Sequence, residues 1–501
     1  MRIPFPEITA QEAAAMINHG DFLGFSGFTA AGSVKDTARA LADRANAEHD
    51  AGREFRVRLV TGASTNNDVD EALAQADAIS WRAPYQSSKT LRKRINAGET
   101  SFLDIHLSHL PQMLDYGFLG EIDVAVVEAI DVTADGRVYL STSAGVTPSV
   151  LHRAKKVIIE LNDAHSPRLW EMHDIAHLRR PPHRHPIPIH HSLSKIGTPF
   201  CTVNPERIAG VVRTNEMDGM GAFAPPDTIS ERIAGHVVDF LLGEMKRGNI
   251  PDEFLPLQAG VGNVSNAVMG GLGRHPDIPK FEMYTEVLQD AQIDVMRSGK
   301  LLGASTSAIT FSDDVMKGVF DDMDFFAQRI VIRPQEFSNN PGVVRRLGVI
   351  AINTVLEMDI YGSANSTHVC GTQLMNGIGG SGDFVRNSYL SILMAPSTAK
   401  GGKISTVVPM CSHVDHNEHS VQVLVTEQGL ADLRGLGPTE RARRIIDRCA
   451  HPEYRDYLHR YVAESPAGHV RHDLGKCFDL HQALLSEGDM RAAFDAMPAN
   501  A

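Results

Sequence analysis

Short apolar runs rich in valine, isoleucine and leucine alternate along the chain with longer stretches in which apolar residues recur at helical spacing. A continuous apolar run of this length is typical of a strand that is buried on both faces. The runs that we expect to form strands are residues 55–61, 124–128, 156–161, 254–257, 330–332 and 421–426. Their alternation with helices predicts an α/β fold built on open, mostly parallel sheets.

A proline-containing segment at residues 222–227 separates the two halves of this pattern. Apolar residues recur at helical spacing from 229 to 242, which predicts a helix there. Asp227 precedes this helix and can cap its N-terminus. Gly248 and Pro251 are expected to end that helix. A chain of 501 residues also exceeds what one hydrophobic core usually organises. We therefore expect two domains, 1–225 and 226–501, with the charged, helical stretch 437–501 packed on the second.

The two halves share short similar segments. Residues 58–65 resemble 300–306, and residues 127–131 resemble 356–359. The offsets of the two pairs differ, so the similarity is only a hint of two related α/β halves.

The charge balance narrows the class of ligand. Asp and Glu number 61 against 48 Lys and Arg, which gives a formal net charge of −13. A surface of that sign repels nucleic acid, so a ligand that carries phosphates would need a local basic spot. The five cysteines are scattered without a C-x-x-C pair, which favours a reducing compartment. No run of about 18 apolar residues occurs, and we expect a cytoplasmic protein without a membrane segment.

Three glycine-containing loops are candidates for contact with a ligand, because glycine lets backbone N–H groups approach closely. The turn at residues 260–265 follows a predicted strand, although an ordinary tight turn would have the same pattern. The loop at 375–384 has four glycines within six positions, and a long irregular turn would also suit it. The third loop places Lys400 and Lys403 around two glycines, either as a phosphate contact or as two solvated lysines.

Two polar side chains are candidates for chemistry. Glu286 stands at the end of an apolar stretch, shortly after the turn at 260–265. A single glutamate near a strand end is usually a solvated surface residue, so its position alone does not make it catalytic. Asn339 precedes an Asn-Pro pair and could offer its amide to a developing oxyanion, or could form an ordinary Asx turn.

Histidines crowd two parts of the chain, and they raise the question of a metal. A metal site needs three or four converging ligands, and the proline-rich setting of residues 181–186 is typical of an exposed loop instead. We therefore expect no metal, and the role of the histidine-rich stretch 165–191 stays open. The histidines are His165, His173, His177, His183, His185, His190 and His191, followed later by His413, His416 and His419.

The sequence contains neither a G-x-S-x-G elbow nor a Walker A loop, which argues against a serine hydrolase and an NTPase.

Five segments considered together resemble the acetyl-CoA hydrolase/transferase family. The segments are residues 260–265, 284–290, 376–384, 397–405 and 425–434. The resemblance runs nearly end to end, from Gly24 to Tyr454. Within the family, the chain is most similar to the succinyl-CoA:acetate CoA-transferases. The resemblance implies a class I CoA-transferase with two related open α/β domains and an active site in the cleft between them.

The resemblance also implies roles for individual residues. Glu286 matches the catalytic glutamate, which becomes a glutamyl-CoA thioester, while Asn339 and the backbone N–H of Gly380 match the oxyanion donors. Positions that hold coenzyme A are matched by Val261, Gly262, Asn263, Val264, Ser265, Gly380 and Lys400. The side of the site that binds the carboxylic acid is matched by Ser64, Thr90 and Glu427.

The function implied by this resemblance is transfer of CoA between a short acyl-CoA, succinyl-CoA above all, and acetate. Such an enzyme works by ping-pong chemistry as a homodimer on small-molecule substrates, without a cofactor beyond coenzyme A itself as substrate. Three alternatives stay open: an acetyl-CoA hydrolase, a propionyl-CoA:succinate CoA-transferase, and a non-catalytic CoA-binding protein on the same scaffold. Segment 217–221 departs from the family pattern because it lacks an arginine near Gly219, which leaves the acid substrate undecided.

Overall fold

The computed structural model describes residues 3–221 and 225–494, so residues 222–224 of the proline-containing segment lie outside the described residues. The chain forms two compact units, and neither is continuous in sequence. The first unit consists of Met1–Phe223, Phe281–Leu347 and Asn376–Asp383. The second consists of Ala224–Lys280, Gly348–Met375 and Phe384–Ala501. This division differs from the expected pair 1–225 and 226–501, because two later stretches make most of their contacts with the N-terminal part.

A nine-stranded sheet forms the centre of the first unit. Its strand order is β4-β3-β2-β1-β5-β6-β8, and β7 pairs with both β5 and β9. The pairs are parallel except for β5 with β6 and β6 with β8. The bounds are β1 Phe22–Phe25, β2 Val57–Val60, β3 Ile79–Ala83, β4 Ser101–Phe102, β5 Val124–Val132, β6 Arg137–Leu140, β7 Lys156–Asn162, β8 Cys201–Thr202 and β9 Ile208–Thr214. The strands expected at 55–61, 124–128 and 156–161 are confirmed as β2, β5 and β7.

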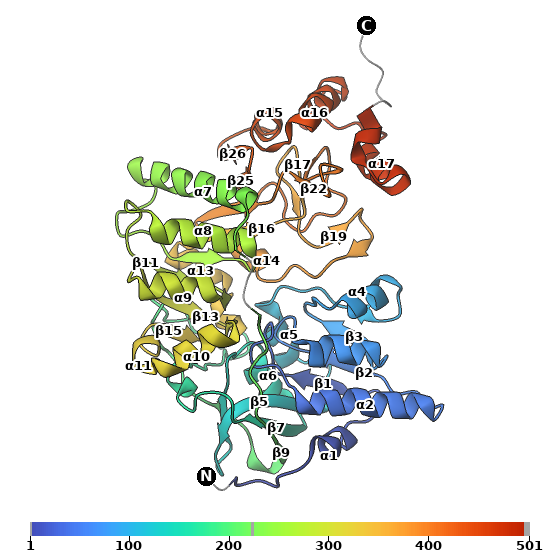
Figure 1. The fold of residues 1–501 in the computed structure, drawn as a ribbon, viewed down its shortest axis with the longest axis vertical. Helices are drawn as coiled ribbons and strands as arrows, with labels where there is room; N and C mark the ends of the chain where they lie inside the picture. Colours follow the sequence, from blue (N-terminus) through green and yellow to red (C-terminus); the bar gives the residue numbers. More distant parts are fainter. Residues whose placement is uncertain (1–2, 222–224, 495–501) are drawn as a thin grey trace. The chain divides into compact units, whose positions relative to one another are not determined.

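Helices cover this sheet, and α2 shows why they form. Ala38, Leu41, Ala42 and Ala45 lie on one face, which packs in one cluster with Leu23, Phe25 and Leu59 of the sheet. Figure 1 shows α2 running beside the blue strands β1 and β2. Burial by helices explains why the parallel strands are continuous apolar runs. The bounds are α1 Ala10–Ala15, α2 Asp36–Asp50, α3 Ala72–Gln75, α4 Lys89–Asn96, α5 His109–Asp115 and α6 Thr147–Arg153.

The stretch Phe281–Leu347 adds a second group of strands to the first unit. Strands β11, β13 and β15 are parallel neighbours, and β12 pairs with β14. Backbone hydrogen bonds join this group to the N-terminal part, including Ala144 N to Ser307 O at 3.0 Å. The strand expected at 330–332 is confirmed as β15. The bounds are β11 Phe281–Tyr284, β12 Val287–Leu288, α9 Asp290–Arg297, β13 Leu301–Thr306, β14 Ala308–Ile309, α10 Asp313–Asp321, α11 Met323–Phe326, β15 Ile330–Ile332, α12 Gln335–Ser338 and α13 Pro341–Leu347.

The second unit has its own mainly parallel strands. They run in the order β10-β16-β21-β25-β26, and only the final hairpin is antiparallel. Three small antiparallel or mixed pairings flank them, including the hairpin of β22 and β23. The expected strand 421–426 is confirmed as β25. The strand bounds are β10 Leu257–Ala259, β16 Ile350–Thr354, β17 Glu357–Asp359, β18 Ala364–Asn365, β19 His368–Val369, β20 Gln373–Leu374, β21 Leu390–Met394, β22 Thr398–Ala399, β23 Ile404–Ser405, β24 Val407–Val408, β25 Val423–Thr426 and β26 Gly429–Asp432.

The helix expected after Asp227 is confirmed as α7, Thr228–Lys246. Asp227 Oδ1 accepts a hydrogen bond from Ser230 N over 2.7 Å, which makes it the N-cap. Gly248 follows the helix with a left-handed φ of 74°. The strand expected at 254–257 is wrong in its bounds, because Phe254 has a φ of 63° and donates its N–H to Pro251 O in a turn. Pairing begins only at Leu257.

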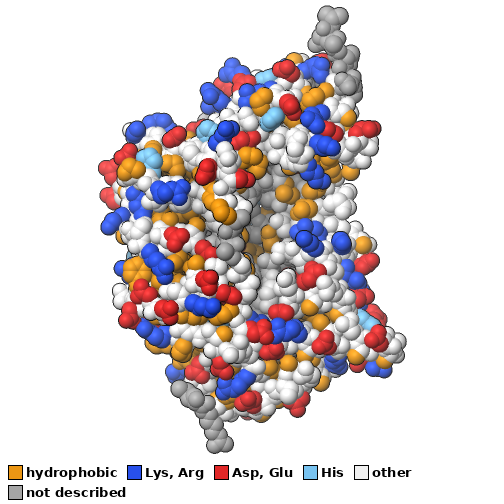
Figure 2. Space-filling model, in the orientation of Figure 1, with side chains coloured by type: hydrophobic (Ala, Val, Ile, Leu, Met, Phe, Trp, Pro, Cys, Tyr) orange, Lys and Arg blue, Asp and Glu red, His pale blue; other side chains and the backbone are white. Residues whose placement is uncertain are grey.

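The C-terminal stretch is helical, as expected. Tyr454, Tyr457 and Leu458 are buried in one apolar cluster with strand residues of the second unit such as Leu393 and Leu424. Among the described residues, no helix is both long enough and apolar enough to cross a membrane. Figure 2 shows acidic and basic side chains interspersed over the visible face. The remaining helices of the unit are α8 Asn263–Arg274, α14 Ser381–Asn387, which begins in the first unit, α15 Pro438–Cys449, α16 Pro452–Glu464 and α17 Asp479–Glu487.

Candidate active site

Glu286 lies just beyond the carboxyl end of strand β11, in the first unit. Its main-chain oxygen accepts hydrogen bonds from Ser307 N over 2.8 Å and from Thr306 Oγ1 over 2.9 Å. The carboxyl ends of parallel strands are where open α/β sheets usually bind ligands. The backbone is therefore fixed on the neighbouring strand β13 while the half-buried side chain remains available for chemistry.

Asn339 lies directly against this carboxyl group. Its Nδ2 donates to Glu286 Oε2 over 2.6 Å, and its Oδ1 accepts from Ser338 Oγ over 2.8 Å. The Asx turn that was the alternative for Asn339 is made by the next residue, since Asn340 Oδ1 accepts from Gly342 N and Val343 N. Asn339 ends helix α12 through its backbone N–H, which donates to Gln335 O over 3.0 Å, while its side-chain amide points at the Glu286 carboxyl group.

Gly380 also packs against the Glu286 carboxylate. A Cβ atom at Gly380 would lie 1.6 Å from Glu286 Oε2 and 3.0 Å from Asn339 Nδ2. Only glycine leaves room for the glutamate here. The structure therefore brings Glu286, Asn339 and Gly380 together, although they come from three different parts of the chain.

The glycine loop around Gly380 is anchored by N-terminal residues of the first unit. Ile378 N donates to Asp104 Oδ1 over 2.9 Å, and Asp383 Oδ1 accepts from Ser108 Oγ over 2.6 Å. A Cβ at Gly382 would lie 2.4 Å from the His106 ring. Sequence reasoning identified the loop but missed these anchors, because nothing in their local sequence distinguishes them from other surface polar residues.

Burial dominates the electrostatics of the site. It raises the pKa of Glu286 to about 8, helped by the negative charge of Asp383 and opposed by the Asn339 hydrogen bond. Burial also raises the pKa of Asp383 to about 6. The pKa of Tyr85 is raised to about 12, by burial first and then by the charge of Glu286. An ionised Glu286 is consequently poorly solvated, which makes it a stronger nucleophile than a carboxylate in water.

The residues expected to hold coenzyme A lie in the second unit, apart from Gly380. Gly262, with a φ of 126°, leads directly into helix α8, which begins at Asn263. Val261, which precedes this helix end, is 48% exposed, and the N-terminal end of a helix favours anionic groups. Lys400 is exposed at the tip of the β22–β23 hairpin, in a left-handed conformation with a φ of 49°.

The residues expected to bind the acid differ in their surroundings. Ser64 is buried in the first unit. Thr90, in the first turn of α4, donates through both its N and Oγ1 to the carboxylate of Glu71. Glu427, in the second unit, accepts from the N and Oγ of Ser397. The side chains of Thr90 and Glu427 therefore already have partners within the protein.

One histidine of the stretch 165–191 belongs to a buried ionic network. Within the described part of the chain, the group that could hold a metal is Glu128, His165 and Asp218, whose ligand atoms lie within 4.8 Å of one another. The ammonium of Lys35 already binds Glu128 and lies 3.2 Å from Asp218. Although burial lowers it, the two carboxylates raise the pKa of His165 to about 10. Two cations thus balance two anions at this point.

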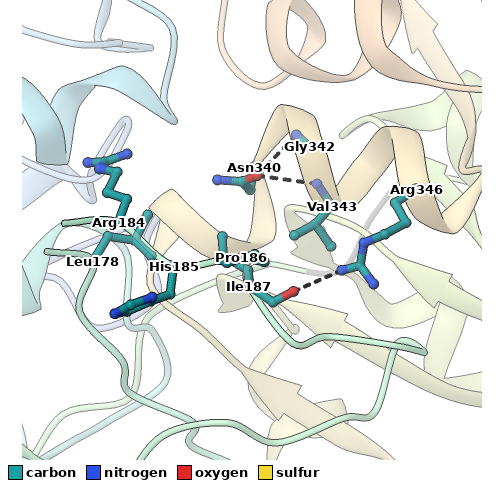
Figure 3. A pocket seen from close by; sticks show the side chains of 9 residues that line it. All are labelled: Leu178, Arg184, His185, Pro186, Ile187, Asn340, Gly342, Val343 and Arg346. Atoms are coloured by element: carbon teal, nitrogen blue, oxygen red, sulfur yellow. Dashed lines mark hydrogen bonds between the residues drawn. The ribbon is translucent and has the colours of Figure 1, made fainter. Parts of the chain in front are cut away.

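A separate pocket of about 330 Å³ lies beside α13 in the first unit. Figure 3 shows Arg184 and Arg346 at opposite ends of its lining, with Asn340 between them. Arg184 Nη2 donates to Glu336 Oε1 over 3.1 Å, and Arg346 Nη2 donates to Ile187 O over 3.0 Å. Both arginines thus hold the loop before residue 190 against α12 and α13.

The family of the chain is shown by its sequence match. Residues 2–213 match the acetyl-CoA hydrolase/transferase N-terminal domain, and residues 316–462 match the C-terminal domain of the same name. The chain belongs to this family. The resemblance inferred from the sequence is thereby confirmed, together with the expectation of an enzyme of the CoA-transferase type.

Individual relatives cover nearly the whole chain. It is 56% identical to "Propanoyl-CoA:succinate CoA transferase" of Escherichia coli K12, over 98% of this chain and 100% of the relative. It is 44% identical to "Succinyl-CoA:acetate CoA-transferase" of Clostridium kluyveri, over 97% and 90%. "Acetyl-CoA hydrolase" of Schizosaccharomyces pombe is 42% identical, over 94% of each chain.

The fold is shared with a solved structure. The 4-hydroxybutyrate CoA-transferase of Porphyromonas gingivalis superposes with a TM-score of 0.62 at 20% sequence identity, covering 91% of this chain and 97% of that one. At this identity the likeness concerns the fold, and it confirms the expected α/β class.

Proposed function

We propose that the protein transfers CoA between succinyl-CoA and a short monocarboxylic acid by ping-pong chemistry through a thioester on Glu286. The observation that carries the proposal is the contact of Asn339 Nδ2 with Glu286 Oε2 at 2.6 Å, with Gly380 packed against the same oxygen. A nucleophilic carboxylate needs donors beside the carbonyl oxygen that becomes an oxyanion, and these two residues supply them.

The first half of the reaction loads CoA onto the protein. The Glu286 carboxylate attacks the thioester carbonyl of the acyl-CoA, which forms an acyl-glutamyl anhydride and releases CoA thiolate. The thiolate then attacks the glutamyl carbonyl of the anhydride. The donor acid leaves as a carboxylate, and Glu286 becomes a glutamyl-CoA thioester.

The second half reverses these steps with a different acid. The incoming carboxylate attacks the glutamyl-CoA thioester, which gives a new anhydride and CoA thiolate. Attack of the thiolate on the acyl carbonyl forms the new acyl-CoA and regenerates the Glu286 carboxylate. Each step passes through a tetrahedral oxyanion, for which Asn339 and the N–H of Gly380 are the donors, and the reactants are the acyl-CoA and the acceptor acid.

Residues of the second unit are proposed to hold the CoA. Helix α8 begins at Asn263, so the partial positive charge of its N-terminal end lies there, and Lys400 adds a positive charge on an exposed hairpin. Both features suit phosphate groups on a protein with a net charge of −13. Binding energy from this distant part of the substrate favours the reacting geometry at Glu286.

The names of the relatives guide the choice of acids. Succinate or succinyl-CoA occurs in the names of both transferases, whereas the partner is propanoyl-CoA in the relative at 56% identity and acetate in that at 44%. We therefore rank propanoate ahead of acetate as the monocarboxylate. Ser64, Thr90 and Glu427 remain proposals for this side of the site, as does the homodimer, which light scattering would test.

The test is turnover of succinyl-CoA with and without an acid. Succinyl-CoA is incubated with the protein alone, with propanoate or with acetate, and the CoA esters are separated by chromatography. We expect propanoyl-CoA or acetyl-CoA to appear in step with the loss of succinyl-CoA. Equal loss without any acid, with free CoA as the product, would favour the hydrolase instead, the activity named for the S. pombe relative.

A further inference from the structure

The amide of Asn339 is held by three neighbouring groups. Its nitrogen donates to Glu286 Oε2 over 2.6 Å, and its oxygen accepts from Ser338 Oγ over 2.8 Å. The same side chain forms a hydrogen bond with Asp383. A primary amide has two N–H donors and one acceptor oxygen, so both donors are used when they point at the two carboxyl groups.

Asp383 is fixed on its far side by Ser108. Its Oδ1 accepts from Ser108 Oγ over 2.6 Å, and its Oδ2 accepts from Ser108 N over 3.0 Å. The N–H of Asp383 also donates to Gly380 O over 3.0 Å, so one short turn carries both residues. Asp383 is 2% exposed and Asn339 is 0% exposed. A buried network with every bond made has one preferred arrangement.

We propose that Asp383 is a positioning residue, which keeps the N–H of Asn339 aimed at Glu286 and holds the Gly380 turn beside the same carboxylate. A carboxylate accepts hydrogen bonds, so Asp383 selects the orientation in which the amide nitrogen faces it. The Ser338 hydroxyl selects the same orientation from the other side. An amide turned by half a rotation would place its oxygen against Glu286 and leave buried groups unpaired.

This inference rests on the proposed function, because the amide matters for rate only if an oxyanion forms on Glu286. It adds a residue that touches neither substrate nor CoA in that chemistry. Asp383 acts through Asn339 and Gly380, so its loss should affect the transition state more than substrate binding.

Asp383 also acts on Glu286 through its charge. Burial is the main cause of the raised pKa of Glu286, and the Asp383 carboxylate raises it further. Neutralising Asp383 should therefore lower the pKa of Glu286, whereas removing an uncharged partner of Asn339 should leave it unchanged. The other titratable or charged groups around these residues are Tyr85, Arg92, Asp104, His106 and His109.

Two variants separate orientation from charge. Asp383→Asn keeps the size of the side chain and removes its charge, and Ser338→Ala removes the donor to the amide oxygen and keeps every charge. For Asp383→Asn we expect kcat to fall about 10- to 100-fold, less than or similar to removal of a whole oxyanion donor. For Ser338→Ala we expect a fall of about 3- to 10-fold, typical of one neutral hydrogen bond.

The measurement is kcat, KM for the acyl-CoA and the pH dependence of kcat/KM for both variants. KM should stay within about twofold of the wild type, as for an interaction made only in the transition state. The acid limb of the profile should move to lower pH in Asp383→Asn alone. A lowered kcat with an unmoved limb in that variant would reduce Asp383 to a structural contact and overturn the inference.

Two further results decide the remaining cases. If Asp383→Asn does not fold, an undiminished kcat in Ser338→Ala overturns the orientation argument, and a lowered kcat with an unmoved limb supports it. If the wild type turns over no acyl-CoA, the proposed function fails. The effect of Asp383 on the pKa of Glu286 can then still be tested by ¹³C NMR titration of the Glu286 carboxyl, whose signal is assigned with Glu286→Gln. If the pKa of Glu286 is the same in the wild type and in Asp383→Asn, the proposed effect of the Asp383 charge is contradicted.

Discussion

Replacing Gly380 with alanine should abolish most of the activity while leaving the protein folded. The new Cβ would lie 1.6 Å from Glu286 Oε2 and 2.6 Å from its Cδ, and real Cβ contacts essentially never fall below 3.0 Å. The carboxylate oxygen must therefore move by at least about 1.4 Å, the difference between these two distances. Because the clashing atoms are the far end of a flexible side chain, the glutamate can move aside without disturbing the backbone.

The expected loss follows from this displacement. The 2.6 Å hydrogen bond between Glu286 and Asn339 would be lengthened or broken, and the carboxylate would leave its present position against Gly380. A misplacement of about 1 Å costs on the order of 100-fold in rate, which corresponds to about 2.7 kcal/mol of transition-state stabilisation. We therefore expect kcat to fall about 100-fold or more.

The assay compares acyl-CoA turnover with thermal unfolding. Gly235→Ala is the matched control, because Gly235 lies within helix α7 and a Cβ there meets nothing within 4 Å. That variant should keep full activity and gain up to about 1 kcal/mol of stability from the better helix propensity of alanine. A Gly380→Ala protein that keeps kcat within about threefold of the wild type would refute the reasoning.

Three further predictions concern charge. The kcat/KM for the acyl-CoA should rise with pH up to about 8, because in the proposed mechanism Glu286 reacts as a carboxylate and burial raises its pKa to about 8; a rate independent of pH between 5.5 and 8 would contradict this. Lys35→Met should lower the free energy of unfolding in urea by about 3–5 kcal/mol, because Glu128 and Asp218 would stay buried with His165 as their one remaining cationic partner among the described residues. The exposed ion pair of Lys155 is the control, and Lys155→Met should change the free energy of unfolding far less, because solvent screens this pair. Lys400→Ala should raise KM for the acyl-CoA several-fold at unchanged kcat, as expected for a contact with a phosphate far from the reacting atoms; an unchanged KM would remove Lys400 from CoA binding.

Strong local patterns predicted the fold well. Continuous apolar runs predicted strands β2, β5, β7, β15 and β25. A strand that is buried on both faces has apolar residues at successive positions, so it can be recognised in the sequence. Helix α7 was predicted from its spacing and from the capping residue Asp227. The strand at 254–257 was misplaced because Phe254 is apolar, yet its left-handed backbone belongs to a turn. Composition carries no information on such a conformation.

The candidate site was predictable only in part, for a different reason. Glu286, Asn339 and Gly380 were assigned from the family resemblance, since each alone looks like an ordinary polar or turn residue. Asp383, Ser108 and the ion network around His165 depend on contacts between residues far apart in the chain. Such contacts follow from the packing of strands and loops, and no local pattern reports them.

The measurement that tests the central claim most directly is mass spectrometry of the protein after incubation with succinyl-CoA and borohydride. Borohydride reduces a glutamyl thioester to a stable alcohol. We predict a mass change confined to the peptide that contains Glu286, absent from Glu286→Ala and diminished when propanoate or acetate is present to accept the CoA. An unmodified Glu286 peptide under conditions of active turnover, or modification of a different residue, would contradict the proposal that Glu286 carries CoA.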